Sequence, residues 1–383
     1  MYTITFYSFK GGVGRTMALV NVAAELVRRG RKVLVVDFDL EAPGLETYKR
    51  LKPLKPHPGI VEFVTEFRRT WHAPEPLDYI YETKPIGKKG GRLWVMPAGR
   101  RDPAYRSALA KLDWQRLYKQ EDGFLLFEDL KKGWEEELKP DYVLIDSRTG
   151  DTDVLGICTR QLPDSVVLMF TPNEQNLAGL ENVCRDIRRE ETEGLKKKIR
   201  LHFVAANVPD LDDEHRILER LMWAFQQRLD FDAFSGVIRR YESLYLLEQS
   251  VFVIDRPRTR LARAFRRLLV KLLMDNPADR VGATQFLEHP HISFSDNAKL
   301  ENRNHRREIA RLFHSDVEIL KTVAHSMVSD KDYASAAQVL DRILEVEPTP
   351  EAQAAREQVR ALELLQANSG IKKSDSPRPA SAD

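Results

Sequence analysis

The chain has 383 residues, of which 42% are hydrophobic, so it is long enough for one large domain with a true core and a smaller second part. Its formal net charge of +2 excludes binding to polyanions through overall charge alone. The two cysteines, Cys158 and Cys184, exclude a disulfide framework and fit a reducing compartment. Because the first predicted strand begins at residue 2 and no apolar run reaches transmembrane length, we expect a cytoplasmic protein without a signal peptide.

The first predicted element is a buried strand over residues 2–8, which are rich in β-branched and aromatic side chains. Residues 17–29 are rich in Ala, Leu and Val and predict a helix that stops at Gly30. The glycines between strand and helix let successive N–H groups turn toward an anion, and the helix N-terminus adds partial positive charge. This segment therefore predicts a phosphate-binding loop, formed by Lys10, Gly11, Gly12, Val13, Gly14, Arg15, Thr16 and Met17.

The loop departs from the standard Walker A pattern at two positions. Phe9 stands where the first Gly is expected, and Arg15 stands where the phosphate-binding Lys is expected. Thr16 keeps the hydroxyl that binds Mg²⁺ in such loops. Arg is always charged and forms planar two-pronged contacts, whereas Lys is a compact point charge. We therefore expect nucleotide binding to tolerate Arg15 better than turnover does, since phosphoryl transfer depends on positioning and electrostatics.

The segment from Lys10 to Thr16, Lys-Gly-Gly-Val-Gly-Arg-Thr, resembles the deviant Walker A motif of the MinD/ParA ATPases. Arg15 resembles a variant branch of that family, the KGGVGR-motif ATPases of bacteria. The resemblance covers residues 1–275 and implies an α/β P-loop NTPase fold, with a mostly parallel central sheet flanked by helices. It further implies that ATP and Mg²⁺ are bound between two subunits of a homodimer. Lys10 would then reach phosphate in the partner subunit, and Arg15 would contact phosphate in its own subunit.

Two acidic residues follow the next predicted strand, residues 32–37, whose nearly continuous apolar sequence is typical of a central parallel strand. Asp37 and Asp39 leave the end of this strand close to the phosphate loop, which suits the organisation of Mg²⁺ and water. The resemblance implies that Asp39 orients the attacking water. It places Asp37 beside the metal.

Residues 142–146 form a second strong pattern, four apolar residues that end in Asp146, as in a Walker B strand. The resemblance implies that Asp146 belongs to the Mg²⁺ shell through a water molecule and that the Gly150 N–H senses the γ-phosphate. Arg148 stands where the family has Pro. A phosphate contact and a plain surface cation are equally compatible with Arg148.

Further strands are predicted at residues 165–170 and 201–207, and residues 78–84 are predicted to pair with residues 92–97 as a hairpin. Alternating strands and helices predict a parallel sheet covered on both faces, with ligands at the carboxyl ends of the strands. Lys10, Asp37, Asp146 and Asn207 all fall at such ends. The resemblance implies that Asn207 holds adenine and that Pro209 lines the base pocket.

A basic segment at residues 256–271 carries apolar residues at helical spacing. We interpret it as an amphipathic helix with a solvated basic face. Nucleic-acid binding through cations such as Arg263 and Arg267 is the less favoured alternative.

The C-terminal part lacks strand patterns. Residues 276–310 are predicted as a connecting segment and 311–366 as a helical extension, with a tetratricopeptide-like helix pair over 316–347 and a further helix over 349–366. A single repeat buries its own face poorly, so this extension is expected to dock on the ATPase or on an unidentified protein partner; a plain helical cap is equally compatible. Residues 367–383 have the composition of a disordered tail and no amphipathic pattern for membrane attachment.

The sequence thus predicts an ATP-hydrolysing dimeric switch, with slow turnover, that regulates a partner or effector, and the KGGVGR resemblance suggests bacterial conflict or signalling systems. One alternative is a nucleotide-gated scaffold with little or no hydrolysis. A second is a DNA-associated partition ATPase. A third, an iron–sulfur reductase, finds no support in the spacing of Cys158 and Cys184.

Overall fold

The computed structural model describes residues 1–87, 89–150, 154–192, 198–211, 214–246, 249–289 and 296–374. The chain divides into two units, Met1–Leu269 and Val270–Asp383. The division falls inside one helix, α9 (Arg260–Met274), slightly before the boundary at residue 275 that the sequence predicts. Among the described residues, no helix combines the length and the apolar character that crossing a bilayer requires.

The first unit is built on an eight-stranded sheet of order β3-β4-β2-β5-β1-β6-β7-β8. Every neighbouring pair is parallel except β3 and β4, which form the predicted antiparallel hairpin. The predicted α/β fold with a mostly parallel sheet is therefore confirmed. The strands are β1 (Tyr2–Tyr7), β2 (Lys32–Phe38), β3 (Tyr81–Glu82), β4 (Arg92–Met96), β5 (Tyr142–Ser147), β6 (Ser165–Phe170), β7 (Arg200–Val208) and β8 (Gly236–Arg239).

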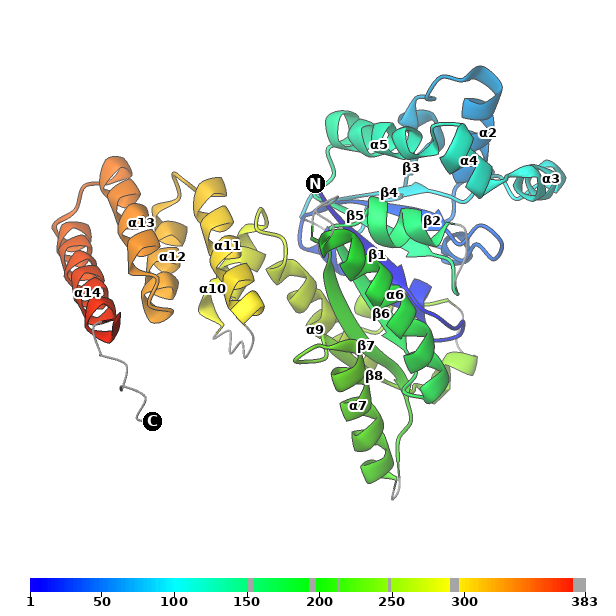
Figure 1. The fold of residues 1–383 in the computed structure, drawn as a ribbon. Coiled ribbons are helices and arrows are strands. Elements are labelled where there is room, and N and C mark those ends of the chain that lie inside the picture. Colours follow the sequence, from blue (N-terminus) through cyan, green and yellow to red (C-terminus); the bar gives the residue numbers. More distant parts are fainter. Residues whose placement is uncertain are drawn as a thin grey trace, which may run out of the picture. The chain divides into compact units, whose positions relative to one another are not determined.

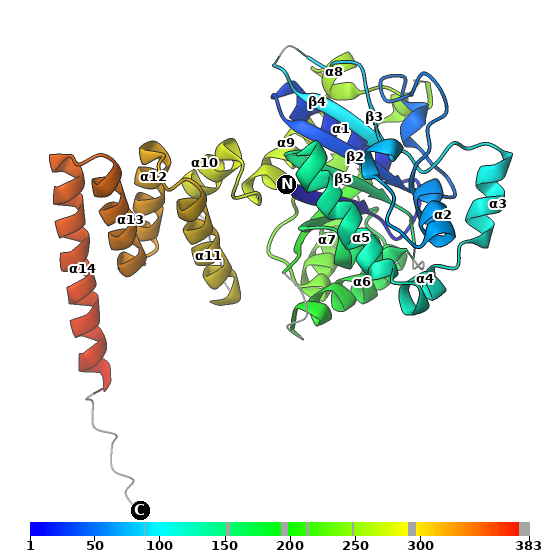
Figure 2. The same cartoon turned by 90° about the horizontal axis from the view of Figure 1, so that it is seen from above.

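Helices cover both faces of this sheet (Figures 1 and 2). On one face lie α2, α5, α6 and α7, and on the other lie α1 and α9. The helices of this unit before α9 are α1 (Arg15–Arg28), α2 (Ile60–Thr70), α3 (Pro103–Lys111), α4 (Trp114–Gln120), α5 (Gly123–Gly133), α6 (Glu174–Thr192), α7 (His215–Leu229) and α8 (Phe252–Asp255).

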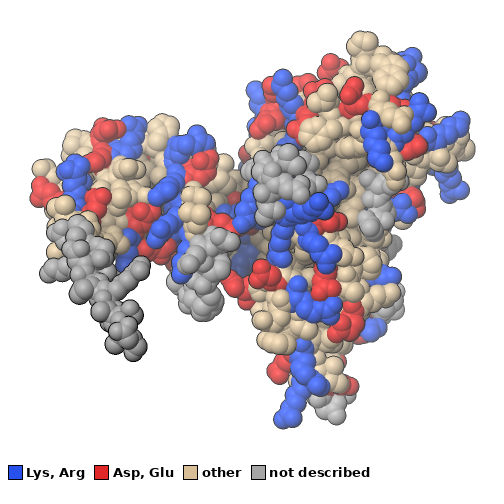
Figure 3. Space-filling model, viewed as in Figure 1, with Lys and Arg blue, Asp and Glu red and all other residues tan. Residues whose placement is uncertain are grey.

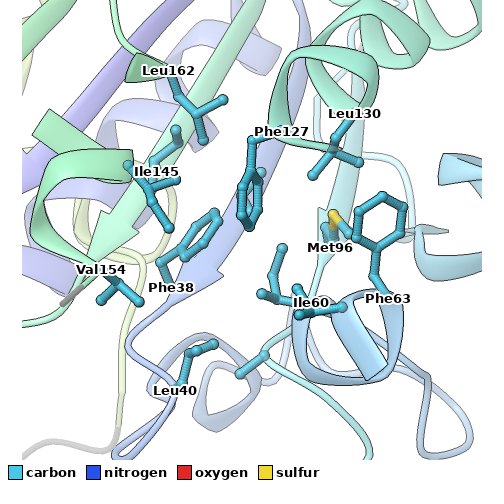
Figure 4. Packing of buried hydrophobic residues seen from close by; sticks show 14 of the residues in the cluster. Phe38, Leu40, Ile60, Phe63, Met96, Phe127, Leu130, Ile145, Val154 and Leu162 are labelled. Carbon is cyan, nitrogen blue, oxygen red and sulfur yellow. The ribbon is translucent and has the colours of Figure 1, made fainter. Parts of the chain in front are cut away.

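The core under α2 and α5 holds the end of β2 in place (Figure 4). Phe38, the last residue of β2, is fully buried, and its ring centroid lies 5.9 Å from that of Phe127 on α5. Ile145 on β5 belongs to the same cluster. Burying side chains of this size contributes about 2 kcal/mol each. This packing fixes the strand ends from which the acidic residues of the site emerge.

Helix α9 confirms the amphipathic interpretation of the basic segment. Leu261, Phe265 and Leu268 are buried, while Arg263 and Arg267 are exposed. Across the visible face of the first unit, Lys and Arg are interspersed with Asp and Glu rather than gathered into one field (Figure 3).

The second unit is helical and has its own core, which includes Phe286, Ile309, Leu320, Leu340 and Val359. The sequence predicts a connecting segment over residues 276–310, but the structure places two helices, α10 and α11, in this range. Their apolar residues complete the core that one helix pair could not bury alone. The helices are α10 (Arg280–Glu288), α11 (Asp296–Leu312), α12 (Val317–Ser329), α13 (Tyr333–Val346) and α14 (Pro350–Ser374).

Helices α12 and α13 match the predicted pair around residues 329–333, and α14 extends past its predicted end at Gln366. The predicted tail therefore begins with helix up to Ser374, and residues 375–383 lie outside the described residues. The tetratricopeptide-like character of this unit stays a prediction.

Candidate functional site

The glycine loop between β1 and α1 has the backbone that an anion cradle needs. Gly12 and Gly14 have φ angles of 79° and 84°, which only glycine adopts without strain. Gly14 caps the N-terminus of α1, and within the part of the chain that the structure describes no side chain makes a capping hydrogen bond there. The first turn carries no acidic residue that would repel an anion. Helix end and loop together thus present unpaired N–H donors beside the predicted phosphate site.

A pocket of about 770 Å³ opens over this loop. Its lining includes the predicted residues Asp39 and Gly11, Gly12, Val13, Gly14, Arg15, Thr16 and Met17. Two further groups that the sequence did not point to also line it: residues between 42 and 48 after β2, and Leu244, Gln249, Ser250 and Phe252 ahead of and within α8. The second group carries no motif, so only the fold could reveal it.

Arg15 lines the pocket, and its guanidinium is held by two carboxylates and a hydroxyl; its predicted contact with phosphate stays a prediction. Its Nε donates to Asp146 Oδ1 at 2.6 Å, and Nη2 donates to Asp39 Oδ2 at 2.8 Å. Its Nη1 donates to Ser8 Oγ at 3.3 Å. Arg15 is only 6% exposed; burial acts to lower its pKa, but the charges of Asp146 and Asp39 outweigh burial and raise it. Arg15 therefore links the end of β2 to the end of β5 as a permanent cation.

Thr16 and Asp146 are arranged as a cation site would need. Thr16 Oγ1 donates to Asp146 Oδ2 at 2.6 Å, which leaves the lone pairs of the hydroxyl oxygen available to a metal. Asp146 and Asp37 are register neighbours on β5 and β2, and both are buried. Burial and the charge of Asp146 raise the pKa of Asp37 well above its usual value. Two buried carboxylates beside a hydroxyl form a donor set that fits Mg²⁺, with Asp146 outside the direct ligand shell.

The loop after β2 carries two more charged contacts. The backbone N–H of Asp39 donates to Asp37 Oδ1 at 3.1 Å, which turns the Asp39 side chain toward the pocket. Arg148 forms a two-pronged ion pair with Glu41, with distances of 2.5 and 2.6 Å. This pair ties the loop after β5 to the loop after β2 at the wall of the nucleotide pocket, and a phosphate contact of Arg148 stays a prediction.

Lys10 lies beside a second pocket of about 490 Å³, formed with α6. The departure at Phe9 has a structural explanation here: a Cβ at Gly179 of α6 would lie 2.3 Å from the Phe9 ring. The glycine thus allows the ring to sit directly on α6. The Lys10 Nζ lies 5.4 Å from the centroid of the same ring, and Lys10 is exposed. Phe9 anchors the start of the loop and presents Lys10 to solvent.

The packing of Phe9 on Gly179 predicts that the same substitution at Gly179 has opposite effects on stability with and without the Phe9 ring. Gly179→Ala should destabilise the first unit by about 1 kcal/mol, because displacing the Phe9 ring costs more than the gain in helix propensity. In a Phe9→Ala background the same substitution should stabilise it by about 0.5–1 kcal/mol, since only the propensity gain remains. All five tryptophans lie before residue 270, so urea unfolding followed by tryptophan fluorescence reports on this unit. The same sign in both backgrounds would refute the contact.

The remaining predicted residues lie outside the lining of the main pocket. The Gly150 N–H donates to the Ser8 carbonyl at 3.4 Å, and Gly150 has a φ of 77°. Asn207 is exposed and has a φ of 53°, at an irregularity in the pairing of β7 with β8. Pro209 is exposed just after this point. Their predicted contacts with the γ-phosphate and with adenine stay predictions.

A strand, a glycine loop, an open helix N-terminus and buried carboxylates on neighbouring strands define a P-loop nucleotide-binding protein. The sequence model of the CobQ/CobB/MinD/ParA nucleotide binding domain matches residues 4–250, so the chain belongs to this family. This membership confirms the predicted MinD/ParA type.

Known proteins similar to this chain fit the same assignment. The nitrogenase iron protein of Methanococcus voltae is 26% identical over 271 residues, which cover 68% of this chain and 84% of that protein. The cell division ATPase MinD of Pyrococcus furiosus has a TM-score of 0.51 at 22% identity and covers 71% of this chain and 98% of its own. MinD of Pyrococcus horikoshii, complexed with Mg-ADP, has a TM-score of 0.51 at 20% identity. The match covers 71% of this chain and 95% of that protein. The two structural similarities indicate the fold.

The two cysteines of this chain bear on the iron–sulfur alternative. Cys158 and Cys184 are free and buried, at 0% and 2% exposure. Burial raises the pKa of Cys184 to about 12, so it is not a ready thiolate ligand. Within the described ranges, no group of three or more His, Cys, Asp or Glu side chains is placed to hold a metal ion. The cysteines thus give the iron–sulfur alternative no structural support.

Proposed function

We propose that this protein is a MgATP-dependent molecular switch that dimerises around ATP, hydrolyses it slowly and thereby controls a partner protein. One observation carries the proposal: Thr16, Asp39 and the glycine loop line one pocket, with Asp37 and Asp146 buried beside it. The family membership supports nucleotide binding and ATPase chemistry in general. The specific nucleotide, the dimer and the partner are our inference.

In this proposal the loop N–H groups of Gly11 to Thr16 hold the phosphates. Thr16 would bind Mg²⁺ directly, with Asp37 beside the ion and Asp146 holding it through a water molecule; the ion would neutralise phosphate charge. Asp39 would orient the attacking water from the pocket wall, and Lys10 would reach the phosphates of the partner subunit. Asn207 and Pro209 would contact the base.

Arg15 gives a reason for slow turnover. Its guanidinium holds Asp39 at 2.8 Å, so the carboxylate that orients water is shared with a permanent cation. Burial raises the pKa of Asp39 in spite of the Arg15 charge, so the limit that we propose is geometric: the ion pair fixes the carboxylate and occupies one of its oxygens. The same pairing supports the second candidate, a nucleotide-gated scaffold with little or no hydrolysis. The KGGVGR resemblance at residues 10–15 favours a regulator in bacterial conflict or signalling systems, with the helical second unit as the part that contacts the partner.

The rate of ATP hydrolysis distinguishes the hydrolysing switch from the nucleotide-gated scaffold. Asp39→Asn removes the negative charge but keeps the shape and the acceptor for Arg15. We expect phosphate release at saturating ATP to fall about 100-fold, because the amide is a poor acceptor for a water proton, while ATP affinity stays within about twofold. Asp78→Asn is the control, since Asp78 is exposed and lies outside every pocket described here. Equal phosphate release from Asp39→Asn and wild type would remove the hydrolytic role and leave the scaffold.

A further inference from the structure

A second large cleft lies on the first unit, next to the nucleotide pocket. It has a volume of about 1,120 Å³ and is lined by side chains from residues 49–57, 81–86 and 249–255. We call it the basic cleft. None of the predicted site residues lines it, so the proposed ATP switch leaves its purpose unexplained.

The basic cleft carries an excess of positive charge. Among the described residues, five Lys or Arg side chains line it against two acidic ones, and both acids are already paired. Glu82 forms a two-pronged ion pair with Arg92, and Asp255 accepts from Arg50 at 2.6 Å. Lys52, Lys55 and Lys84 are exposed and supply the charge that a ligand would meet. A cleft of one sign concentrates ligands of the opposite sign.

Apolar groups lie among these lysines. Leu54 is 96% exposed, which is the largest exposure among the large hydrophobic side chains described. Pro53, Pro56 and Pro85 line the same cleft. Proline fixes the backbone, so the walls lose little freedom when a ligand binds. The cleft therefore suits a ligand with both negative and apolar groups.

The groups that favour nucleic acid are not available in this lining. Single strands are held by open aromatic faces and by Arg forks. The Tyr81 ring packs against His57 at 5.3 Å between centroids, and its hydroxyl donates to the Leu51 carbonyl. Arg50 is held by Asp255. The lysines of the cleft complement carboxylates of a ligand. The prolines and the exposed Leu54 between them complement apolar side chains placed among those carboxylates. We propose that the basic cleft binds an acidic, leucine-containing segment of a partner protein.

The cleft shares walls with the nucleotide pocket. Gln249 and Ser250 line both, and Lys49 directly follows Thr47 and Tyr48, which line the nucleotide pocket. A nucleotide that orders these segments would change the affinity of the cleft for its ligand. The cleft ligand would then change the affinity for nucleotide by the same factor. Peptide binding itself does not rest on the proposed switch; only its modulation by ATP does.

The test uses the full chain and a fluorescein-labelled peptide of about 18 residues that repeats Glu-Glu-Leu, followed by fluorescence anisotropy at near-physiological salt. Combined charge reversal Lys52→Glu, Lys55→Glu and Lys84→Glu should weaken binding at least about 30-fold, since three contacts of roughly 0.7 kcal/mol each are lost and reversed. The matched control is Lys111→Glu, Lys119→Glu and Lys132→Glu, three exposed lysines outside the cleft. The control should bind within about threefold of wild type.

A second variant separates an acidic peptide from a general polyanion. Leu54→Ser should weaken the Glu-Glu-Leu peptide about fivefold and leave the binding of oligo-dT unchanged, because only the peptide uses the apolar contact. Three results would overturn the proposal: no peptide binding, equal losses in the cleft and control variants, or tighter binding of oligo-dT that displaces the peptide. Repeating the titration with ATP tests the coupling alone, so its failure would leave the cleft assignment intact.

Discussion

Asp146→Leu is expected to destabilise the first unit by about 3–5 kcal/mol. The substitution leaves the Arg15 guanidinium buried without its closest partner, at 2.6 Å in the wild type, and breaking a buried ion pair from one side carries this cost. Thr16 loses its acceptor in the same step. Urea unfolding at neutral pH, followed by tryptophan fluorescence, measures the change in the first unit alone.

The double variant Arg15→Leu with Asp146→Leu should recover at least half of that loss. Removing both charges leaves no unpaired buried ion, and apolar replacements of buried pairs are often close to neutral. Arg15→Leu alone should be as harmful as Asp146→Leu, because it leaves Asp146 and Asp37 as adjacent buried acids. Glu41→Leu is the control: its pair with Arg148 is partly exposed, so about 1 kcal/mol or less is expected. An additive double variant would contradict a structural ion pair.

These variants bear on how the Walker A position works in this chain. A lysine at position 15 would be a point charge, whereas the arginine fork bonds to two strands at once. The exchange therefore adds a permanent structural connection between the ends of β2 and β5. We infer that Arg15 restricts the motion of the Asp39 side chain and thereby makes the pocket more ordered.

Much of the fold follows from local sequence patterns. The apolar runs that end at Asp37 and Asp146 are buried central strands, and the glycine loop lies between a strand and a helix as its residues predict. Periodicity also identifies the helix pair α12 and α13. Such patterns are visible because each depends on neighbours in the chain.

What the sequence did not reveal depends on contacts between distant segments. Leu244, Gln249, Ser250 and Phe252 line the nucleotide pocket without any motif. The carboxylate partners of Arg15 lie 24 and 131 positions away along the chain. The fit of Phe9 onto Gly179 is visible only once α6 is placed against the loop. Residues 276–310 lack a strong apolar pattern, so the sequence predicts a connecting segment there. The structure instead has helices α10 and α11. Their helical order is explained by burial of residues such as Ile309 in the core of the second unit.

The most direct test of the proposed switch is the mass of the protein in solution with and without MgATP, measured by light scattering for wild type, Lys10→Ala and the control Lys119→Ala. The chain mass is 44.1 kDa, so we expect about that mass without nucleotide and about twice it with MgATP for wild type and control. Lys10→Ala should stay monomeric, since losing two symmetric lysine–phosphate contacts of about 2 kcal/mol each weakens the dimer about 1,000-fold. A wild-type mass that ATP does not change, or a Lys10→Ala variant that dimerises as wild type does, would contradict the switch.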